Sequence, residues 1–139
     1  ISTFARPARR EELGTLIQFV MDGCATHGLD AQTLSDLRLA VEEACTNLIE
    51  HAYPADAPGP IELTVSADDD RVVVEIRDQA PPFDPAGLSP PDLGADWQDR
   101  PVGGLGWHLI RSVMDEVRYV SDAAGNRLTL VKRRPPSRA

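Results

Sequence analysis

Glu43 and Asn47 lie one helical turn apart in a predicted helix, and their side chains suit phosphate chemistry. A carboxylate beside a hydroxyl group can accept its proton, and an amide oxygen suits Mg²⁺, which keeps phosphates and water as its other ligands. The pair therefore predicts a general base next to a metal ligand, although the spacing alone also fits a solvated helix edge. His51 follows one turn later and is expected at the rim, hydrogen-bonded to the next loop.

Asp78 ends a predicted strand on the same face as three apolar residues, Val72, Val74 and Ile76. A carboxylate that points toward the core needs a hydrogen-bond donor, and the amino group of adenine is one such donor. The alternative is that Asp78 caps the following turn and that Gln79 to Pro82 are plain loop.

Three glycines, Gly103, Gly104 and Gly106, open another predicted helix, with Leu105 between them. A helix N-terminus presents unpaired N–H groups, and glycine lets a phosphate approach the backbone, so this segment is a candidate phosphate cradle. It is neither a Walker A loop nor a dinucleotide fingerprint, and a hinge between loop and helix is the alternative. Arg100, just before it, is either a phosphate contact or a solvated charge.

The elements that must position these residues are read from hydrophobic periodicity. Apolar spacing predicts helices at 9–26, from Asp30 or Thr33 to Pro54, and from 103 onward. Alternation predicts strands near 3–6, 61–65, 72–78, 117–121 and 127–132, with a turn at 68–70 and a long irregular loop at 79–102. This order predicts an α+β two-layer sandwich, with a mostly antiparallel mixed sheet covered on one face by about three helices.

Composition excludes several classes of protein. The 139 residues fit one domain, 1–139, and 14 Lys and Arg against 22 Asp and Glu give a net charge of −8, which opposes nucleic-acid binding. No apolar run is long enough to span a membrane, and no signal peptide is visible. Cys24 and Cys45 fall among apolar residues, as buried thiols of a cytoplasmic protein do.

Taken in order, these motifs resemble those of the GHKL ATPase superfamily and, within it, the bacterial anti-sigma-factor serine kinases. Residues 39–53 resemble the N box, 78–85 the first glycine box, 103–106 the second glycine box, and 125–132 the last strand. The resemblance covers nearly the whole chain.

The resemblance implies a GHKL (Bergerat) ATP-binding fold with ATP and Mg²⁺ as cofactors. Glu43 would be the general base, Asn47 the Mg²⁺ ligand and Asp78 the acceptor for the adenine amino group, with Ala80 beside adenine. Gly104 and Gly106 would hold phosphates, a lid would span 84–103, and the tail after 133 would be flexible. The implied activity is phosphorylation of a serine on a STAS-type anti-anti-sigma partner by a protein that otherwise holds a sigma factor. Homodimerisation is a further expectation.

Two departures from the family pattern are visible. Ala80 and Pro82 stand at the two glycine positions of the first glycine box, where a backbone that needs positive φ would be strained by alanine. Gly125-Asn126 replaces the Gly-Thr that larger members of the superfamily carry at the start of the last strand. One alternative is therefore an ATP-binding anti-sigma module without kinase activity. Another is the catalytic domain of a histidine kinase.

Overall fold

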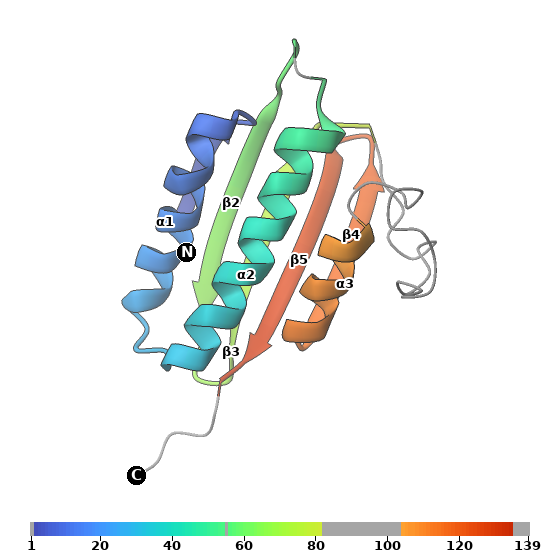
Figure 1. Ribbon diagram of the computed structural model, residues 1–139. Coiled ribbons are helices and arrows are strands. Elements are labelled where there is room, and N and C mark those ends of the chain that lie inside the picture. Colours follow the sequence, from blue (N-terminus) through green and yellow to red (C-terminus); the bar gives the residue numbers. More distant parts are fainter. Residues whose placement is uncertain (1, 55, 82–103, 135–139) are drawn as a thin grey trace.

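The computed structural model describes residues 2–54, 56–81 and 104–134, and these form two layers (Figure 1). Three helices, α1 (Leu13–Ala25), α2 (Ala31–Asn47) and α3 (Gly104–Val113), cover one face of a five-stranded sheet. The strand order is β1-β2-β3-β5-β4, with bounds Ser2–Pro7, Pro60–Ala67, Arg71–Asp78, Gly125–Arg133 and Glu116–Asp122 in that order. The predicted α+β sandwich is confirmed. Every strand pair among the described residues is antiparallel, so the sheet is not mixed.

The core lies between the helices and the inner face of the sheet. Alternate residues of β2 and β3 are buried, and the register sets Leu63 opposite Ile76 and Val65 opposite Val74. These apolar side chains pack against the buried stripes of α1 and α2. The alternation that predicted the hairpin therefore also selects the face that the helices cover.

The first helix begins later than its sequence pattern predicts. Residues Arg10–Glu12 form a 3₁₀ turn, and α1 proper starts at Leu13. The buried stripe of α1 is the predicted one, with Leu16, Val20 and Cys24 fully buried. A tightened first turn is common at a helix N-terminus, which is why the apolar period is right and the boundary is not.

The second helix changes its winding before it ends. Asp30 is its N-cap and accepts a hydrogen bond from the Thr33 backbone N–H at 2.7 Å. After Asn47 the chain continues as a π-helical turn, η2 (Leu48–Ala52), which the Tyr53 N–H closes on the Leu48 carbonyl at 3.1 Å. A single α-helix up to Pro54 was therefore the wrong prediction, because an apolar stripe does not reveal a local change of helical pitch.

Lys132 ties the two layers together. Its ammonium group lies 2.8 Å from Asp36 Oδ2 on α2 and donates to the Val113 carbonyl at 2.7 Å, at the end of α3. Both charged side chains are largely buried, so solvent screens the pair less than it screens a surface ion pair. One cation on β5 thus fixes α2 and α3 relative to the sheet.

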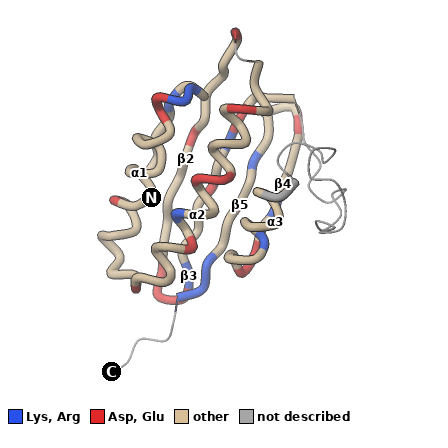
Figure 2. The backbone as a smooth tube through the Cα atoms, viewed as in Figure 1, with Lys and Arg blue, Asp and Glu red and all other residues tan. Residues whose placement is uncertain are grey.

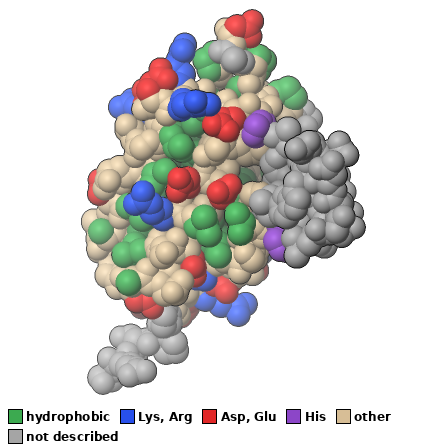
Figure 3. All heavy atoms as spheres, in the orientation of Figure 1, with side chains coloured by type: hydrophobic (Ala, Val, Ile, Leu, Met, Phe, Trp, Pro, Cys, Tyr) green, Lys and Arg blue, Asp and Glu red, His purple; other side chains and the backbone are tan. Residues whose placement is uncertain are grey.

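Acidic residues lie on the surface of the helical layer. Figure 2 marks acidic positions along α2, and Figure 3 shows acidic side chains on the face that the helices form, in keeping with the net charge of −8. Among the residues that the structure describes, no helix combines the length and hydropathy needed to cross a bilayer. Cys24 and Cys45 are free and buried, and burial raises the pKa of the Cys24 thiol to about 11 and that of Cys45 to about 12.

Gly125 has a φ of +118°, and a Cβ there would lie 2.6 Å from the Asp78 carbonyl oxygen. Gly125→Ala is therefore expected to lower the free energy of unfolding by about 1–3 kcal/mol, the typical cost of a strained backbone position. Gly14→Ala is the matched control, because nothing lies within 4 Å of a Cβ at Gly14 in α1. That control should stabilise the helix by up to about 1 kcal/mol. Urea unfolding checks both variants, and a neutral Gly125→Ala would contradict the strain argument.

Candidate functional site

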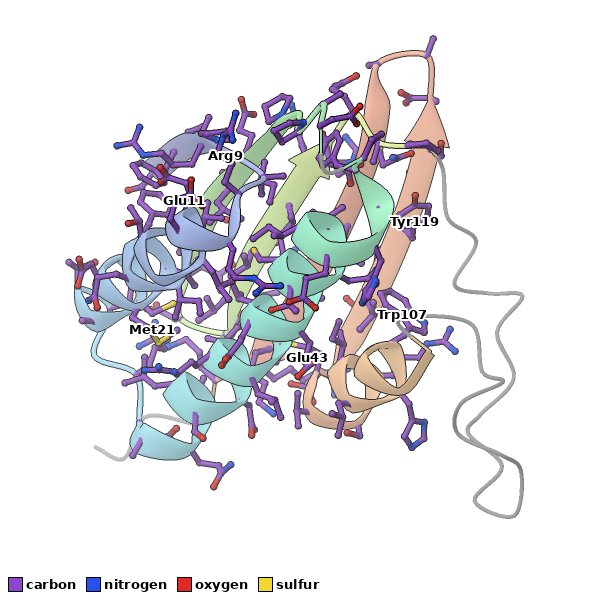
Figure 4. All side chains as sticks on the ribbon, turned by 45° about the horizontal axis from the view of Figure 1, so that its top comes forward. Arg9, Glu11, Met21, Glu43, Trp107 and Tyr119 are labelled. Atoms are coloured by element: carbon purple, nitrogen blue, oxygen red, sulfur yellow. The ribbon has the colours of Figure 1, made fainter. Side chains whose placement is uncertain are left out.

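Glu43 on α2 and Gly106 on α3 lie against each other. The two helices pack side by side, and the labelled Glu43 side chain lies between them (Figure 4). A Cβ built on Gly106 would lie only 2.7 Å from Glu43 Oε2. The missing side chain of the glycine leaves room for the carboxylate, and a side chain at this position would make the end of the glutamate shift. The two residues predicted as general base and phosphate cradle thus meet in space.

Gly106 belongs to the first turn of α3, which begins at Gly104. The N–H groups of a first turn have no intrahelical partner and carry the positive end of the helix dipole. The turn can therefore hold an anion directly beside the Glu43 carboxylate. Arg100, Gly103 and the predicted lid at 84–103 lie outside the described residues, as does the side chain of Leu105.

Asn47 is the last residue of α2 and is half-buried, one turn beyond Glu43. No other described residue hydrogen-bonds to the side chain of Asn47 or Glu43, so both keep their oxygen atoms available. The described residues contain no group of three or more His, Cys, Asp and Glu side chains placed to hold a metal. A metal at Asn47 would therefore take its remaining ligands from a substrate and from water, as Mg²⁺ commonly does.

His51 lies in the π-helical turn that follows Asn47 and is exposed. Its Nε2 lies 3.8 Å from Glu50 Oε2. The imidazole is therefore at the rim as predicted, but it faces the neighbouring glutamate on its own turn.

Asp78 is 6% exposed, and both of its hydrogen bonds from described residues end on Oδ1. The Ala80 backbone N–H donates at 2.9 Å and the Asn126 side-chain amide at 2.8 Å. Burial raises the pKa of Asp78 above its ordinary value, and these two hydrogen bonds act in the opposite direction. The carboxylate does cap the following turn, yet the cap uses one oxygen and leaves Oδ2 available for a ligand donor.

Asn126 belongs to the candidate site through its hydrogen bonds, and the sequence patterns did not identify it as a site residue. Its side-chain N–H groups bond Asp78 Oδ1 and the Ala80 carbonyl, both at 2.8 Å, and its side chain is 4% exposed. The register of β3 and β5 sets Asn126 directly opposite Asp78. Its position beside Gly125 marked it only as a departure from Gly-Thr, because sequence spacing does not reveal which strand pairs with β3.

Ala80 occupies its glycine position without the expected strain. Among the described residues, only Gly28 and Gly125 have positive φ, so Ala80 has an ordinary backbone conformation. The residue is 7% exposed, and its N–H and carbonyl groups are both used in the hydrogen bonds to Asp78 and Asn126. The condition under which alanine would be strained here, a backbone with positive φ, is therefore not met, and Pro82 lies outside the described residues.

The structure thus assembles the predicted residues into two groups. Glu43 and Gly106 form one group on the helices, and Asp78 and Ala80, with Asn126, form the other at one end of the sheet. No hydrogen bond joins the two groups among the described residues. A ligand that contacts both groups would place a hydrogen-bond donor at Asp78 and an anionic group at the first turn of α3.

Asp78 and Asn126 of the second group line a hollow of about 290 Å³, and Arg77, Arg127 and Glu62 line it as well. The last three residues occupy the sheet face opposite the buried side chains, and Glu43 and Gly106 do not line the hollow. The hollow therefore adjoins the second group of the candidate site and not the first.

Comparison with known proteins found a matching family and several relatives. The family described as histidine kinase-like ATPase domain matches residues 6–132. The serine-protein kinase RsbW of Bacillus licheniformis is 35% identical over 122 residues, which are 84% of this chain and 76% of that protein. The protein of the same name from Bacillus subtilis (strain 168) is 34% identical over 132 residues, or 91% and 81% of the two chains.

A solved structure of the RsbU and RsbW domains of a Mycobacterium tuberculosis protein has the same fold, with a TM-score of 0.62 at 18% identity. The match covers 100% of this chain and 35% of that one, so this chain spans about a third of the length of the solved protein.

The buried carboxyl group of Asp78 should make the free energy of unfolding depend on pH. Because the folded pKa is raised, the folded state binds more protons than the unfolded state between the ordinary and the raised pKa. The free energy of unfolding contributed by Asp78 therefore falls as pH rises through that window. Asp78→Asn keeps an oxygen for Ala80 and Asn126 and should remove this fall.

Urea unfolding of both proteins between about pH 4 and 7 tests the prediction. The wild type should lose stability relative to Asp78→Asn as pH rises. Asp69→Asn, in the exposed β2–β3 turn, is the matched control. A stability difference between wild type and Asp78→Asn that stays constant over this range would contradict the assignment.

Proposed function

The chain belongs to the histidine kinase-like ATPase domain family, and on that premise we propose that it is an anti-sigma factor and a serine protein kinase that uses Mg²⁺ and ATP. Relatives named serine-protein kinases, similar over most of the chain, support the activity. The proposed substrate is a serine of a STAS-type anti-anti-sigma protein, and the proposed second partner is a sigma factor. Such a role belongs in the cytoplasm.

One observation carries this proposal: the Glu43 carboxylate lies against the first turn of a glycine-opened helix. Phosphoryl transfer depends mainly on positioning and on neutralising charge, and it needs an acceptor for the proton of the attacking hydroxyl. A carboxylate beside an anion-binding helix N-terminus meets both needs at one place.

The remaining groups fit an adenine nucleotide. Asp78 Oδ2 would accept a hydrogen bond from the adenine amino group, and the first turn of α3 would hold phosphate oxygens. The Asn47 amide oxygen would be the protein ligand of Mg²⁺. Bound MgATP would supply the transferable phosphoryl group with part of its charge neutralised. Each of these side-chain oxygens is free of other described partners, which supports the assignment.

Glu43 would accept the serine proton as the hydroxyl oxygen attacks. Its place beside α3 puts the carboxylate next to the helix N-terminus at which the phosphates are proposed to bind. The packing of the two helices holds it there, and no described residue makes a hydrogen bond to it that substrate would have to break.

Asn47→Ala is expected to abolish the Mg²⁺ dependence of ATP binding, because it removes the proposed protein ligand of the metal. Calorimetric titration of ATP with and without Mg²⁺ measures this on both proteins. Gln32→Ala is the matched control, since it removes an exposed amide of the same helix that bonds Asp36. Equal Mg²⁺ dependence in wild type and Asn47→Ala would remove Asn47 from the metal site.

Glu43→Gln is expected to retain ATP binding and to lower phosphotransfer by about 10²- to 10⁴-fold, the usual contribution of a general base. The measurement is transfer of labelled γ-phosphate to a purified STAS-domain protein from the same genome. Glu42→Gln, the neighbouring carboxylate on α2, is the matched control. Normal transfer by Glu43→Gln would refute the base assignment. A wild type that binds ATP and a sigma factor but phosphorylates nothing would favour a binding module without kinase activity.

A further inference from the structure

Tyr53 lies just after the π-helical turn and is 8% exposed. Its hydroxyl group donates to the Pro60 carbonyl at 2.7 Å and accepts a hydrogen bond from the Gln79 backbone N–H at 2.6 Å. Pro60 begins β2, and Gln79 directly follows Asp78 at the end of β3. One hydroxyl group therefore joins the end of the π-helical turn to the start of β2 and to the residue that follows β3.

The ring of Tyr53 packs closely against Gly59. A Cβ built on Gly59 would clash with Cε1 of the ring and would lie 2.8 Å from Cζ and 3.0 Å from the hydroxyl oxygen. One edge of the ring and its hydroxyl group therefore lie close to Gly59, where the missing side chain leaves room for them. The hydroxyl group is held by packing as well as by its two hydrogen bonds.

The segment that Tyr53 holds is the one that carries Asp78. Gln79 is also fixed through its side chain, which donates to the Ala124 carbonyl at 2.8 Å in the β4–β5 turn. The next N–H along the chain, that of Ala80, donates to Asp78 Oδ1. Loss of the Tyr53 hydroxyl would leave the Gln79 N–H without its acceptor, and an unpaired N–H shifts the backbone to find another partner.

Tyr53 is also joined to the helix that carries Glu43 and Asn47. Its own backbone N–H closes the π-helical turn on Leu48, the residue after Asn47. Tyr53 thus contacts the end of the helix that carries Glu43 and Asn47 through its backbone, and the residue next to Asp78 through its side chain. Among the described residues, no other hydrogen bond joins residues 48–53 to residues 78–80.

We propose that Tyr53 is a positioning residue that holds Asp78 in place for adenine and so sets the preference of the site for a purine with a 6-amino group. The proposal rests on the proposed function. A carboxylate oxygen accepts a hydrogen bond from a 6-amino group, whereas a 6-oxo group presents a second acceptor to it. A site built around a hydrogen bond rejects analogues that cannot make it, but only while its geometry is held.

Tyr53→Phe tests the proposal, because it removes the hydroxyl and keeps the ring. Binding of ATP and of inosine triphosphate, its 6-oxo analogue, is measured by calorimetry with Mg²⁺ on the full chain. The variant should bind ATP about three- to tenfold more weakly, the effect of one lost hydrogen bond, with inosine triphosphate affinity unchanged. The ATP preference should fall by the same factor, and kcat at saturating ATP should stay the same.

Gly59→Ala is the second variant, because it displaces the ring while the hydroxyl remains. It should also lower the preference of the site for ATP over inosine triphosphate. Thr64→Val is the matched control, since it removes a hydroxyl of β2 that faces Thr3 on the outer sheet face. A merely structural role would weaken both nucleotides equally and leave their ratio unchanged.

The outcomes separate this proposal from the proposed function. A wild type that prefers ATP, with an unchanged preference in both variants, would overturn the role of Tyr53 and leave the kinase assignment standing. A wild type that binds neither nucleotide would overturn both proposals, and a wild type that binds both equally would overturn only the role of Tyr53 in nucleotide preference. A preference lost in both variants and kept in Thr64→Val is the expected result.

Discussion

The burial of the Asp78 carboxylate at the end of β3 is the constraint around which this end of the molecule is built. A buried carboxylate needs donors, and the antiparallel register of β3 and β5 supplies Asn126 directly opposite it. Asn126 also holds the Ala80 carbonyl, and Gln79 is held from the β4–β5 turn. The sheet order therefore matters for function, because β5 must lie next to β3 for the carboxylate to be held in place.

A second constraint joins the helical layer to the sheet. The proposed catalytic carboxylate comes from α2 and the anion-binding turn comes from α3. Both helices are distant from Asp78 in the sequence. Lys132 connects these two helices to the sheet, because it belongs to β5 and contacts both Asp36 on α2 and the end of α3. The same strand thus supports Asp78 at one end and orients the two helices at the other.

The structure explains two departures from the family pattern together, Ala80 in the first glycine box and Gly125-Asn126 at the start of the last strand. Alanine is tolerated at position 80 because its backbone does not require positive φ, and positive φ is found instead at Gly125. Gly125 packs against the Asp78 carbonyl, and Asn126 beside it supplies the donor for the carboxylate. Conformational freedom and hydrogen bonding are both provided at the start of the last strand.

The chain order of motifs, the apolar stripes of the helices and the alternation of β2 and β3 could be read from the sequence, because they depend on local periodicity and on residue type. The inward direction of Asp78 followed from the same alternation. The π-helical turn after Asn47, the pairing of Asn126 with Asp78 and the contact between Glu43 and Gly106 could not be read in this way. They depend on helix pitch, on strand order and on helix packing, and those are decided by which surfaces meet when the chain folds.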